Sequence, residues 1–280
     1  MFEIKVSDLL NSLTSLLSED FDTARIDVEL LICHALNWRR EKLYSNSDHL
    51  LSDKEQAEIQ ELINRRLTGV PIAYILGSQE FWSLPFKVTP ATLIPRPETE
   101  HLVEQALNLI SKSQQANILD LGTGSGAIAL SIAKERPNSF ITAVDSSLDA
   151  LVVAKENART LNISNVEFLQ SNWFENVEDN NFDVIVSNPP YIAEDDPHLK
   201  EGDVIFEPNS ALISGQDGLI DIKIILSQAK GYMKDDAWVL FEHGYDQAGS
   251  VQKTMSDLQY RNIRSIKDYS GHERITIAQK

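Results

Sequence analysis

The fold of this chain is decided by the stretch NILDLGTGSG, residues 117–126. Its first half is apolar, as in a buried strand, and its second half is a glycine-rich turn leading into a predicted helix at 127–134. Such a turn lets a ligand approach the backbone, with the N-terminus of the following helix behind it. We therefore expect a ligand at the carboxyl end of this strand.

Strands and helices alternate on the C-terminal side of this turn. Apolar runs predict seven strands, at 117–121, 140–144, 166–169, 182–187, 237–242, 262–267 and 274–278. Helical periodicity predicts helices at 98–110, 127–134, 148–161, 219–232 and 247–258. This order predicts an α/β fold with a doubly wound, mostly parallel sheet and helices on both faces. The last two strands are expected to add an antiparallel hairpin at one edge.

The first part of the chain has a different pattern. Leucine, isoleucine and valine recur at helical spacing from about Lys5 to Leu67, and Ser52–Glu55 has the pattern of a capping box. We expect a small all-α domain at 1–78 with these apolar stripes as its core. Residues 79–97 are rich in proline and aromatic residues, which predicts a linker before a sheet domain at 98–280. Within this linker, residues 80–82 and 86–88 are expected to pair as a β-hairpin. The linker aromatics either cover a gap between the domains or line the mouth of a site.

Composition indicates a soluble globular protein. The chain has 280 residues, of which 42% are hydrophobic, and no apolar run approaches the length that spans a bilayer. Cys33 is the only cysteine, so an internal disulfide is excluded and a reducing, cytoplasmic location is expected. Cys33 and His34 are adjacent rather than at ligand spacing, and we assign no metal ligands.

The charge is strongly acidic along the whole chain. The formal net charge is −17, with 14 Asp and Glu against 8 Lys and Arg before Phe81, and 28 against 17 from there on. Nucleic-acid-binding surfaces are usually basic, so this balance weighs against DNA or RNA as the main partner. It favours a basic protein partner or a small cationic ligand.

A second motif, Asn188-Pro189-Pro190-Tyr191, directly follows the strand predicted at 182–187. The prolines stiffen the backbone and restrict the residues before them. The side-chain carbonyl of Asn188 and the backbone carbonyl of Pro189 can then accept both N–H bonds of a target –NH2 group, while Tyr191 packs on its flat face. The alternative interpretation is a Pro-Pro turn with an incidental polar residue in front.

The glycine turn leaves two cofactor hypotheses. Gly122, Gly124 and Ala127 satisfy a permissive dinucleotide fingerprint, with Asp145 where such folds keep a ribose-binding acid. Asp120, however, would repel a pyrophosphate but can face a cationic ligand. We therefore favour S-adenosylmethionine, which has ribose hydroxyls, a sulfonium, an ammonium and no phosphate. Trp173 either packs on the adenine or covers the edge of the sheet.

With these parts in order, the chain resembles the HemK-like (PrmC) protein-(glutamine-N5) methyltransferases, which modify peptide chain release factors. The resemblance covers essentially the whole chain and rests on the segments 80–85, 93–100, 120–126, 187–191, 206–208 and 242–244. It implies a Rossmann-like, class I methyltransferase sheet that uses S-adenosyl-L-methionine. It also implies a class 1 release factor as the partner, with the target glutamine in a Gly-Gly-Gln tripeptide and the N-terminal helices helping to recognise it.

The resemblance further implies the site residues. Cofactor contacts are expected from Gly122, Thr123, Gly124, Ser125, Gly126, Asp145, Trp173 and Asn188. The target glutamine is expected to be held by Asn188, Pro189, Pro190 and Tyr191. Asn172 stands where the family often has an acid, which puts a carboxylate contact to the adenine amino group in doubt.

Glu98, Glu100 and Glu207 are expected near the site, without assigned roles. We expect a monomer that contacts neither a membrane nor nucleic acid directly. Two rivals remain: an adenine-N6 DNA or RNA methyltransferase, and a translation-associated protein that binds the cofactor without turnover.

Overall fold

The computed structural model describes residues 4–280, so the first three positions of the predicted helical domain lie outside it. The chain divides into two compact units, one ending at Gly77 and one running from Ser78 to Lys280. Within residues 4–280, no helix combines the length and the apolar character needed to cross a membrane.

The first unit is mainly helical. Its elements are β1 (Ile4–Lys5), α1 (Val6–Leu17), α2 (Ala24–Leu36), α3 (Arg40–Ser45), β2 (Leu50–Leu51), α4 (Asp53–Leu67) and α5 (Ile72–Leu76). The apolar stripes of α1, α2 and α4 form its core, as the helical spacing predicts. Helix α4 opens with the predicted capping box between Ser52 and Glu55. We expected an all-α domain, but the short strands β1 and β2 pair antiparallel within it.

The second unit carries the sheet. Its strands are β3 (Ser78–Phe81), β4 (Leu84–Lys87), β5 (Asn117–Leu121), β6 (Phe140–Asp145), β7 (Val166–Gln170), β8 (Phe182–Ser187), β9 (Met233–Glu242), β10 (Arg261–Lys267) and β11 (Glu273–Gln279). Its α-helices are α6 (Glu100–Leu109), α7 (Ala127–Glu135), α8 (Leu148–Thr160), α9 (Ile220–Ala229) and α10 (Ala248–Asp257). Four 3-10 turns complete it: η1 (Pro97–Thr99), η2 (Pro197–Lys200), η3 (Gly202–Phe206) and η4 (Asn209–Ala211).

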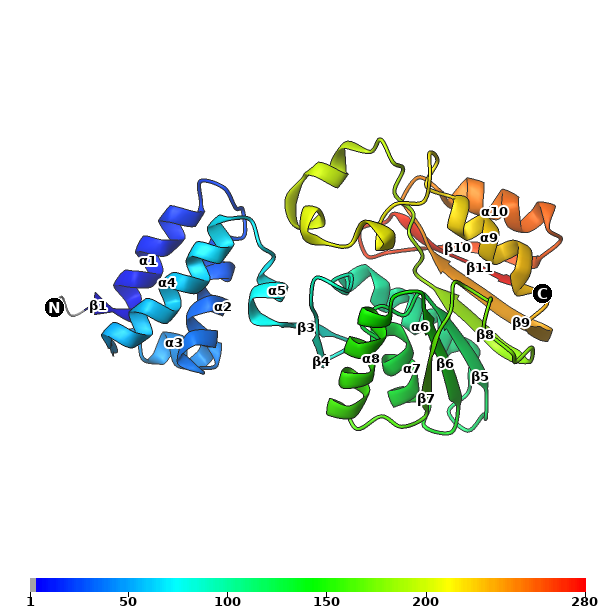
Figure 1. Ribbon diagram of the computed structural model, residues 1–280, viewed down its shortest axis with the longest axis horizontal. Helices are drawn as coiled ribbons and strands as arrows, with labels where there is room; N and C mark the ends of the chain where they lie inside the picture. Colours follow the sequence, from blue (N-terminus) through cyan, green and yellow to red (C-terminus); the bar gives the residue numbers. More distant parts are fainter. Residues whose placement is uncertain (1–3) are drawn as a thin grey trace. The chain divides into compact units, whose positions relative to one another are not determined.

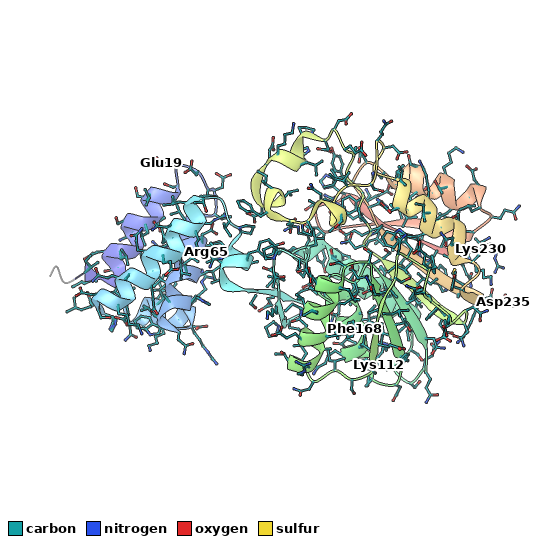
Figure 2. All side chains as sticks on the ribbon, viewed as in Figure 1. Glu19, Arg65, Lys112, Phe168, Lys230 and Asp235 are labelled. Carbon is teal, nitrogen blue, oxygen red and sulfur yellow. The ribbon has the colours of Figure 1, made fainter. Side chains whose placement is uncertain are left out.

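The main sheet has seven strands in the order β10-β11-β9-β8-β5-β6-β7. The strands from β9 to β7 pair in parallel, and β11 and β10 extend the sheet antiparallel beyond β9. Helices α6, α7 and α8 cover one face of the sheet, and α9 and α10 cover the other (Figure 1). The charged residues Lys112 and Asp235, both labelled in Figure 2, are exposed on this unit. The predicted doubly wound α/β fold is confirmed.

The strand order places the site. From β5 the chain passes to β6 and β7 on one side, and then returns to β8 and β9 on the other. At such a topological switch point the loops diverge and leave a crevice beyond the carboxyl ends of the strands. The crevice here lies between the ends of β5 and β8. The glycine turn leaves β5 and the Asn-Pro-Pro-Tyr motif leaves β8.

The hairpin β3–β4 belongs to the second unit, and its turn differs from the predicted one. We expected residues 80–82 to pair with 86–88, but Phe81 pairs with Leu84, and Trp82-Ser83 alone form the turn. Both turn residues have positive φ, at 53° and 56°. Two-residue hairpin turns of type I′ require positive φ at both positions, which is unusual for a bulky aromatic residue. The Glu100 carboxylate accepts a hydrogen bond from the Trp82 backbone N–H at 2.7 Å and stabilises the turn.

Candidate active site

Two loops leave the sheet side by side. Leu121 of β5 and Ser187 of β8 are paired residues of parallel neighbours. The Ser187 hydroxyl also donates a hydrogen bond to the Leu121 carbonyl at 2.7 Å. Gly122 and Asn188 are therefore the first residues beyond the sheet on adjacent strands. The two motifs found in the sequence meet at this point.

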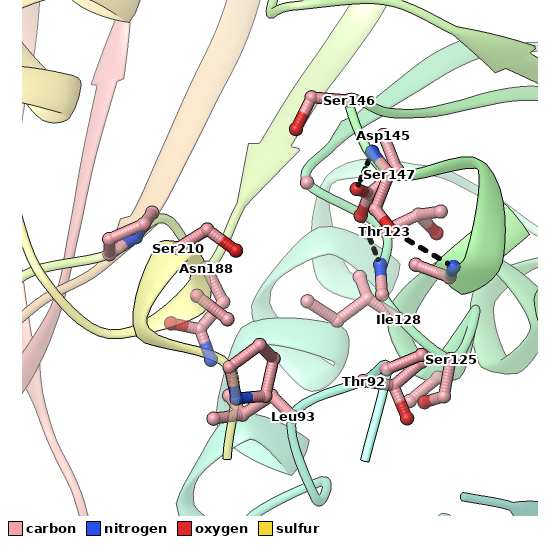
Figure 3. Close-up of a pocket in the computed structure, with 18 of the residues that line it drawn as sticks. Thr92, Leu93, Thr123, Ser125, Ile128, Asp145, Ser146, Ser147, Asn188 and Ser210 are labelled. Atoms are coloured by element: carbon pink, nitrogen blue, oxygen red, sulfur yellow. Dashed lines mark hydrogen bonds between the residues drawn. The ribbon is translucent and has the colours of Figure 1, made fainter. Parts of the chain in front are cut away.

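A pocket opens beyond these strand ends and encloses about 960 Å³, its open mouth included. Asp145, Ser146 and Ser147 lie on one wall, and Asn188 and Ser210 on another (Figure 3). Of the predicted site residues, those that line it are Gly122, Thr123, Gly124, Ser125, Asp145, Trp173, Asn188 and Pro190. Gly126, Pro189 and Tyr191 do not line this pocket.

The sequence did not predict most of the other lining residues, although Ala127 and Asn172 belong to patterns named above. Most come from the segment before α6, the start of α8 and the turn η4. They are Ala91, Thr92, Leu93, Pro95, Arg96, Thr99, Ala127, Ile128, Ser146, Ser147, Ala150, Ser171, Asn172, Pro208, Ser210 and Ala211. The segment 93–100 had been noted only as part of a family resemblance. The small serines after Asp145 carry no spacing signal of their own.

The glycine turn presents its backbone to the pocket. Gly122 has φ +76°, and a Cβ there would lie 3.4 Å from the Trp173 ring. The indole therefore packs over the turn rather than only covering the edge of the sheet. Gly126, which we expected to touch the cofactor, instead caps α7, where a Cβ would lie 3.0 Å from Leu130 Cδ1. Its role is close packing of the helix against its neighbours.

Asp145 organises the other wall. Its Oδ2 accepts from the Gly124 N–H at 2.8 Å, and its Oδ1 accepts from the Ser147 N–H at 2.9 Å (Figure 3). Burial raises the pKa of this carboxyl, while the backbone N–H groups of Ser147 and Gly124 act in the opposite direction. The carboxylate thus ties the glycine turn to the start of α8 and still lines the pocket.

We expected Asp120 to face a cationic ligand, but the structure places its side chain elsewhere. It is fully buried and does not line the pocket. Its Oδ2 accepts a hydrogen bond from the Thr123 hydroxyl at 2.6 Å, which fixes the glycine turn from inside the sheet. Burial raises the pKa of Asp120 to about 7. Its carboxyl group is therefore not directed into the pocket.

Asn188 lies where two pockets meet. Besides the pocket above, it lines a smaller second pocket whose lining is Leu93, Arg96, Asn188, Tyr191, Ile192, Val204, Ala211 and Leu212. The Nδ2 group of Asn188 donates to the Thr99 hydroxyl at 3.3 Å. The side-chain oxygen of Asn188 is thus left as the acceptor. Tyr191 lines the second pocket and Pro190 the first, while Pro189 lines neither.

The segment before α6 is joined to the loop that follows the Asn-Pro-Pro-Tyr motif. The Glu207 carboxylate is buried and accepts from the Ile94 N–H at 2.9 Å and from the Arg96 guanidinium. Burial raises the pKa of Glu207, and the positive charge of Arg96 opposes that effect. Glu207 therefore holds together two walls of the site. The sequence predicts Glu207 near the site but does not indicate this role.

Comparisons with known proteins agree with this geometry. The family model of the methyltransferase small domain matches residues 99–219, and that of the PrmC N-terminal domain matches residues 8–77. The release factor glutamine methyltransferase of Aliivibrio fischeri is 46% identical over 272 residues, which are 97% of this chain and 95% of that protein. This chain belongs to the release factor glutamine methyltransferase family. The Vibrio cholerae member is 48% identical over 92% of this chain and 90% of its own length.

Solved structures share the fold of this family member. A methyltransferase from Pyrococcus furiosus superposes with a TM-score of 0.54 at 20% identity and covers 78% of this chain and 96% of its own. A 16S rRNA N2 methyltransferase of Thermus thermophilus, solved with AdoMet and guanosine, gives a TM-score of 0.53 at 16% identity. That likeness covers 72% of this chain and 49% of the rRNA enzyme. At these identities the likeness concerns the fold alone.

Behind the Asn-Pro-Pro-Tyr motif of this family member lies a buried carboxylate. Glu242, the last residue of β9, is 2% exposed, and its Oε1 accepts from the Tyr191 hydroxyl at 3.4 Å. Burial raises the pKa of Glu242 to about 7. Burial likewise raises the pKa of the Tyr191 hydroxyl, and the negative charge of Glu242 adds to it. Tyr191 is therefore a neutral hydrogen-bond donor.

Gly218, which we did not predict as a site residue, packs against the same loop. Gly218 has φ +68°, and a Cβ there would lie 2.3 Å from the Tyr191 carbonyl oxygen. That oxygen accepts from the Gln247 side-chain amide at 2.9 Å. We expect Gly218→Ala to lower the free energy of unfolding by about 2–4 kcal/mol, because strain at positive φ adds to a backbone clash. Urea denaturation of the second unit would measure this loss.

Gly249→Ala is the matched control. Gly249 lies in α10 with nothing within 4 Å of its Cβ position, and alanine favours helices. This variant should be neutral or stabilised by up to about 1 kcal/mol. Equal stability of the Gly218→Ala protein and the wild type would show that the loop relaxes freely around Tyr191.

Proposed function

We propose that this chain transfers a methyl group from S-adenosylmethionine to the side-chain amide nitrogen (N5) of the glutamine in the Gly-Gly-Gln tripeptide of class 1 release factors. The name and high identity of its relatives support the reaction. The observation that carries the proposal is the place of Asn188. It lines both the larger pocket and the second pocket, with its side-chain oxygen available as an acceptor.

The larger pocket fits the cofactor. Only two of its lining side chains are charged, Arg96 and Asp145, so it offers no cluster of cations for a pyrophosphate. Asp145 would hold the ribose hydroxyls, Trp173 and Ile128 provide apolar surface, and the glycine turn offers open backbone. When bound, the cofactor supplies an electrophilic methyl group on a positively charged sulfur.

The acceptor residues would bind a weak nucleophile, the side-chain amide nitrogen of glutamine. The lone pair of an amide nitrogen is delocalised into its carbonyl, so the nitrogen must be oriented and electrostatically supported. The Asn188 oxygen and the Pro189 carbonyl would each accept one N–H bond of the glutamine amide, and Tyr191 would pack against it. The bound cofactor would supply the methyl group, and the amide nitrogen that receives it would lose one N–H proton to solvent water. Catalysis then consists of positioning and of stabilising developing charge.

We further propose that the protein acts in the cytoplasm as a monomer without direct nucleic-acid contact. Its formal net charge of −17 supports the last point, because a nucleic-acid-binding surface would need to neutralise phosphates. An adenine-N6 enzyme would present the same planar –NH2 group to these residues, but would also have to grip a flipped base and its backbone.

Methyl transfer from labelled S-adenosylmethionine tests the function directly. The acceptors are a class 1 release factor, its Gly-Gly-Gln→Gly-Gly-Ala variant, and DNA and RNA in separate reactions. We expect label on the unmodified release factor alone. Label on the Gly-Gly-Ala variant would contradict the target residue, label on nucleic acid would support the adenine-N6 rival, and no label at all would support a non-catalytic protein.

A further inference from the structure

The oxygen of the target amide has no assigned partner in the proposed reaction. A glutamine side chain offers two N–H bonds and one carbonyl oxygen, which only accepts. The Asn188 oxygen and the Pro189 carbonyl would take the N–H bonds, and neither can donate to the remaining oxygen. A desolvated carbonyl oxygen without a hydrogen bond costs binding free energy. The acceptor site therefore needs a donor on the oxygen side of the amide.

The second pocket offers few side-chain donors. Among the described residues that line it, three have polar side chains: Arg96, Asn188 and Tyr191. The Nδ2 group of Asn188 donates to the Thr99 hydroxyl at 3.3 Å, and the Tyr191 hydroxyl donates to Glu242 at 3.4 Å. Both of these donors are thus directed away from a ligand, and Arg96 remains.

The Arg96 guanidinium lies between the two pockets. Arg96 lines both of them, and its side chain is 31% exposed. Within residues 4–280, the guanidinium donates to one partner, the fully buried carboxylate of Glu207, through Nη2. A guanidinium carries several further N–H donors in a fixed plane. One edge of the group is therefore anchored, and the rest is available to a ligand.

The ion pair with Glu207 also moderates the positive charge of Arg96. An unpaired cation at the junction of the pockets would repel the sulfonium of the cofactor in the larger one. It would also attract a carboxylate as readily as an amide. Paired with Glu207, the guanidinium is chiefly a directed donor, which suits a neutral carbonyl oxygen.

We propose that Arg96 is a substrate-binding residue, whose guanidinium donates a hydrogen bond to the carbonyl oxygen of the target glutamine amide. The inference rests on the proposed function. It gives the planar amide a third fixed point, because a flipped amide would set its oxygen against the Asn188 and Pro189 acceptors and its NH2 group against a cation. Arg96 thereby helps to present the nitrogen, rather than the oxygen, to the methyl group.

The test is a double-mutant cycle between the protein and its substrate. Dissociation constants are measured for a class 1 release factor and for its Gly-Gly-Gln→Gly-Gly-Ala variant, with S-adenosylhomocysteine bound so that no methyl group is transferred. The ratio of the two constants reports what the glutamine side chain contributes. We expect this ratio to be about 10-fold smaller in Arg96→Met than in the wild type, because only the unmodified release factor loses a charge-assisted hydrogen bond.

A purely structural role of Arg96 gives a different result. If Arg96 only holds the walls of the site together with Glu207, both dissociation constants rise by the same factor and their ratio is unchanged, which overturns the inference. Arg159→Met is the matched control. It makes the same substitution at an exposed position in the last turn of α8, outside both pockets, and should leave both constants at their wild-type values.

Arg96→Lys replaces the methionine variant if that protein does not fold. Lysine keeps a cation for Glu207 but lacks the planar fork that reaches two partners, so we expect a similar fall in the ratio. A wild-type ratio in this variant would then overturn the inference, as would a wild-type protein that binds both release factors equally well. A wild-type protein that does not methylate the release factor refutes the proposed function instead, so the two failures are distinguishable.

Discussion

Asn188→Ala is expected to lower kcat by about 10²-fold or more, by analogy with the loss of one preorganised polar group in other active sites. The alanine removes the oxygen that accepts from the glutamine amide at the junction of the two pockets. It leaves Asp145 and the glycine turn in place. Single-turnover methylation of the release factor measures the loss, and equilibrium titration with S-adenosylmethionine should show a nearly unchanged dissociation constant.

Asn181→Ala provides the matched control for this variant. Asn181 is exposed, precedes the other end of β8, and accepts only a 3.2 Å hydrogen bond from Asn117. Its replacement should leave turnover unchanged. If Asn188→Ala lost cofactor affinity in proportion to its loss of turnover, Asn188 would belong to the cofactor site rather than the acceptor site.

Asp145→Ala is expected to do the reverse and weaken S-adenosylmethionine binding by roughly 100-fold, because hydrogen bonds to a charged group contribute more than neutral ones. The variant would lose the acceptor for the ribose hydroxyls and would also release the Gly124 and Ser147 N–H groups. Calorimetric titration measures the dissociation constant. At saturating cofactor, kcat should recover to a large extent.

Asp149→Ala makes the same change four residues later, at an exposed position in the first turn of α8. It removes a negative charge from the same helix end without touching the pocket, so its cofactor affinity should stay close to the wild-type value. An unchanged dissociation constant in Asp145→Ala would refute the assignment of Asp145 to the cofactor.

The fold was predictable because its signals are local. The strands β5, β6 and β8 are mostly apolar and buried, as expected for strands covered on both faces. The alternation of strands with helices then implies a parallel sheet. Strand β9 was predicted from Ala237 but begins at Met233. Its charged start resembles a loop, and Asp236 has a positive φ of 63° beside a register shift between β8 and β9.

The site was predictable where a motif follows a strand and hidden where distant segments meet. The glycine turn, Asp145 and Asn188 each come directly after or at the end of a strand, so the topology brings them together. Thr99 and Gly218 do not, and only the tertiary structure shows that they hold Asn188 and Tyr191. The turn at Trp82-Ser83 lacks the usual glycine or asparagine, and its stabilising partner, Glu100, lies 18 residues away.

The two halves of the site differ in the sequence separation of the residues that their hydrogen bonds join. The cofactor half is almost local, since Gly124 and Asp145 are only 21 residues apart. Two hydrogen bonds close the acceptor half. One joins Asn188 to Thr99, 89 positions away in the chain, and the other joins Glu207 to Ile94, 113 positions away. Longer loops lose more chain entropy on closure, and non-local contacts form slowly. The half of the crevice built by the glycine turn and Asp145 can therefore assemble early in folding, whereas the half that contains Asn188 forms only after distant segments of the second unit have met.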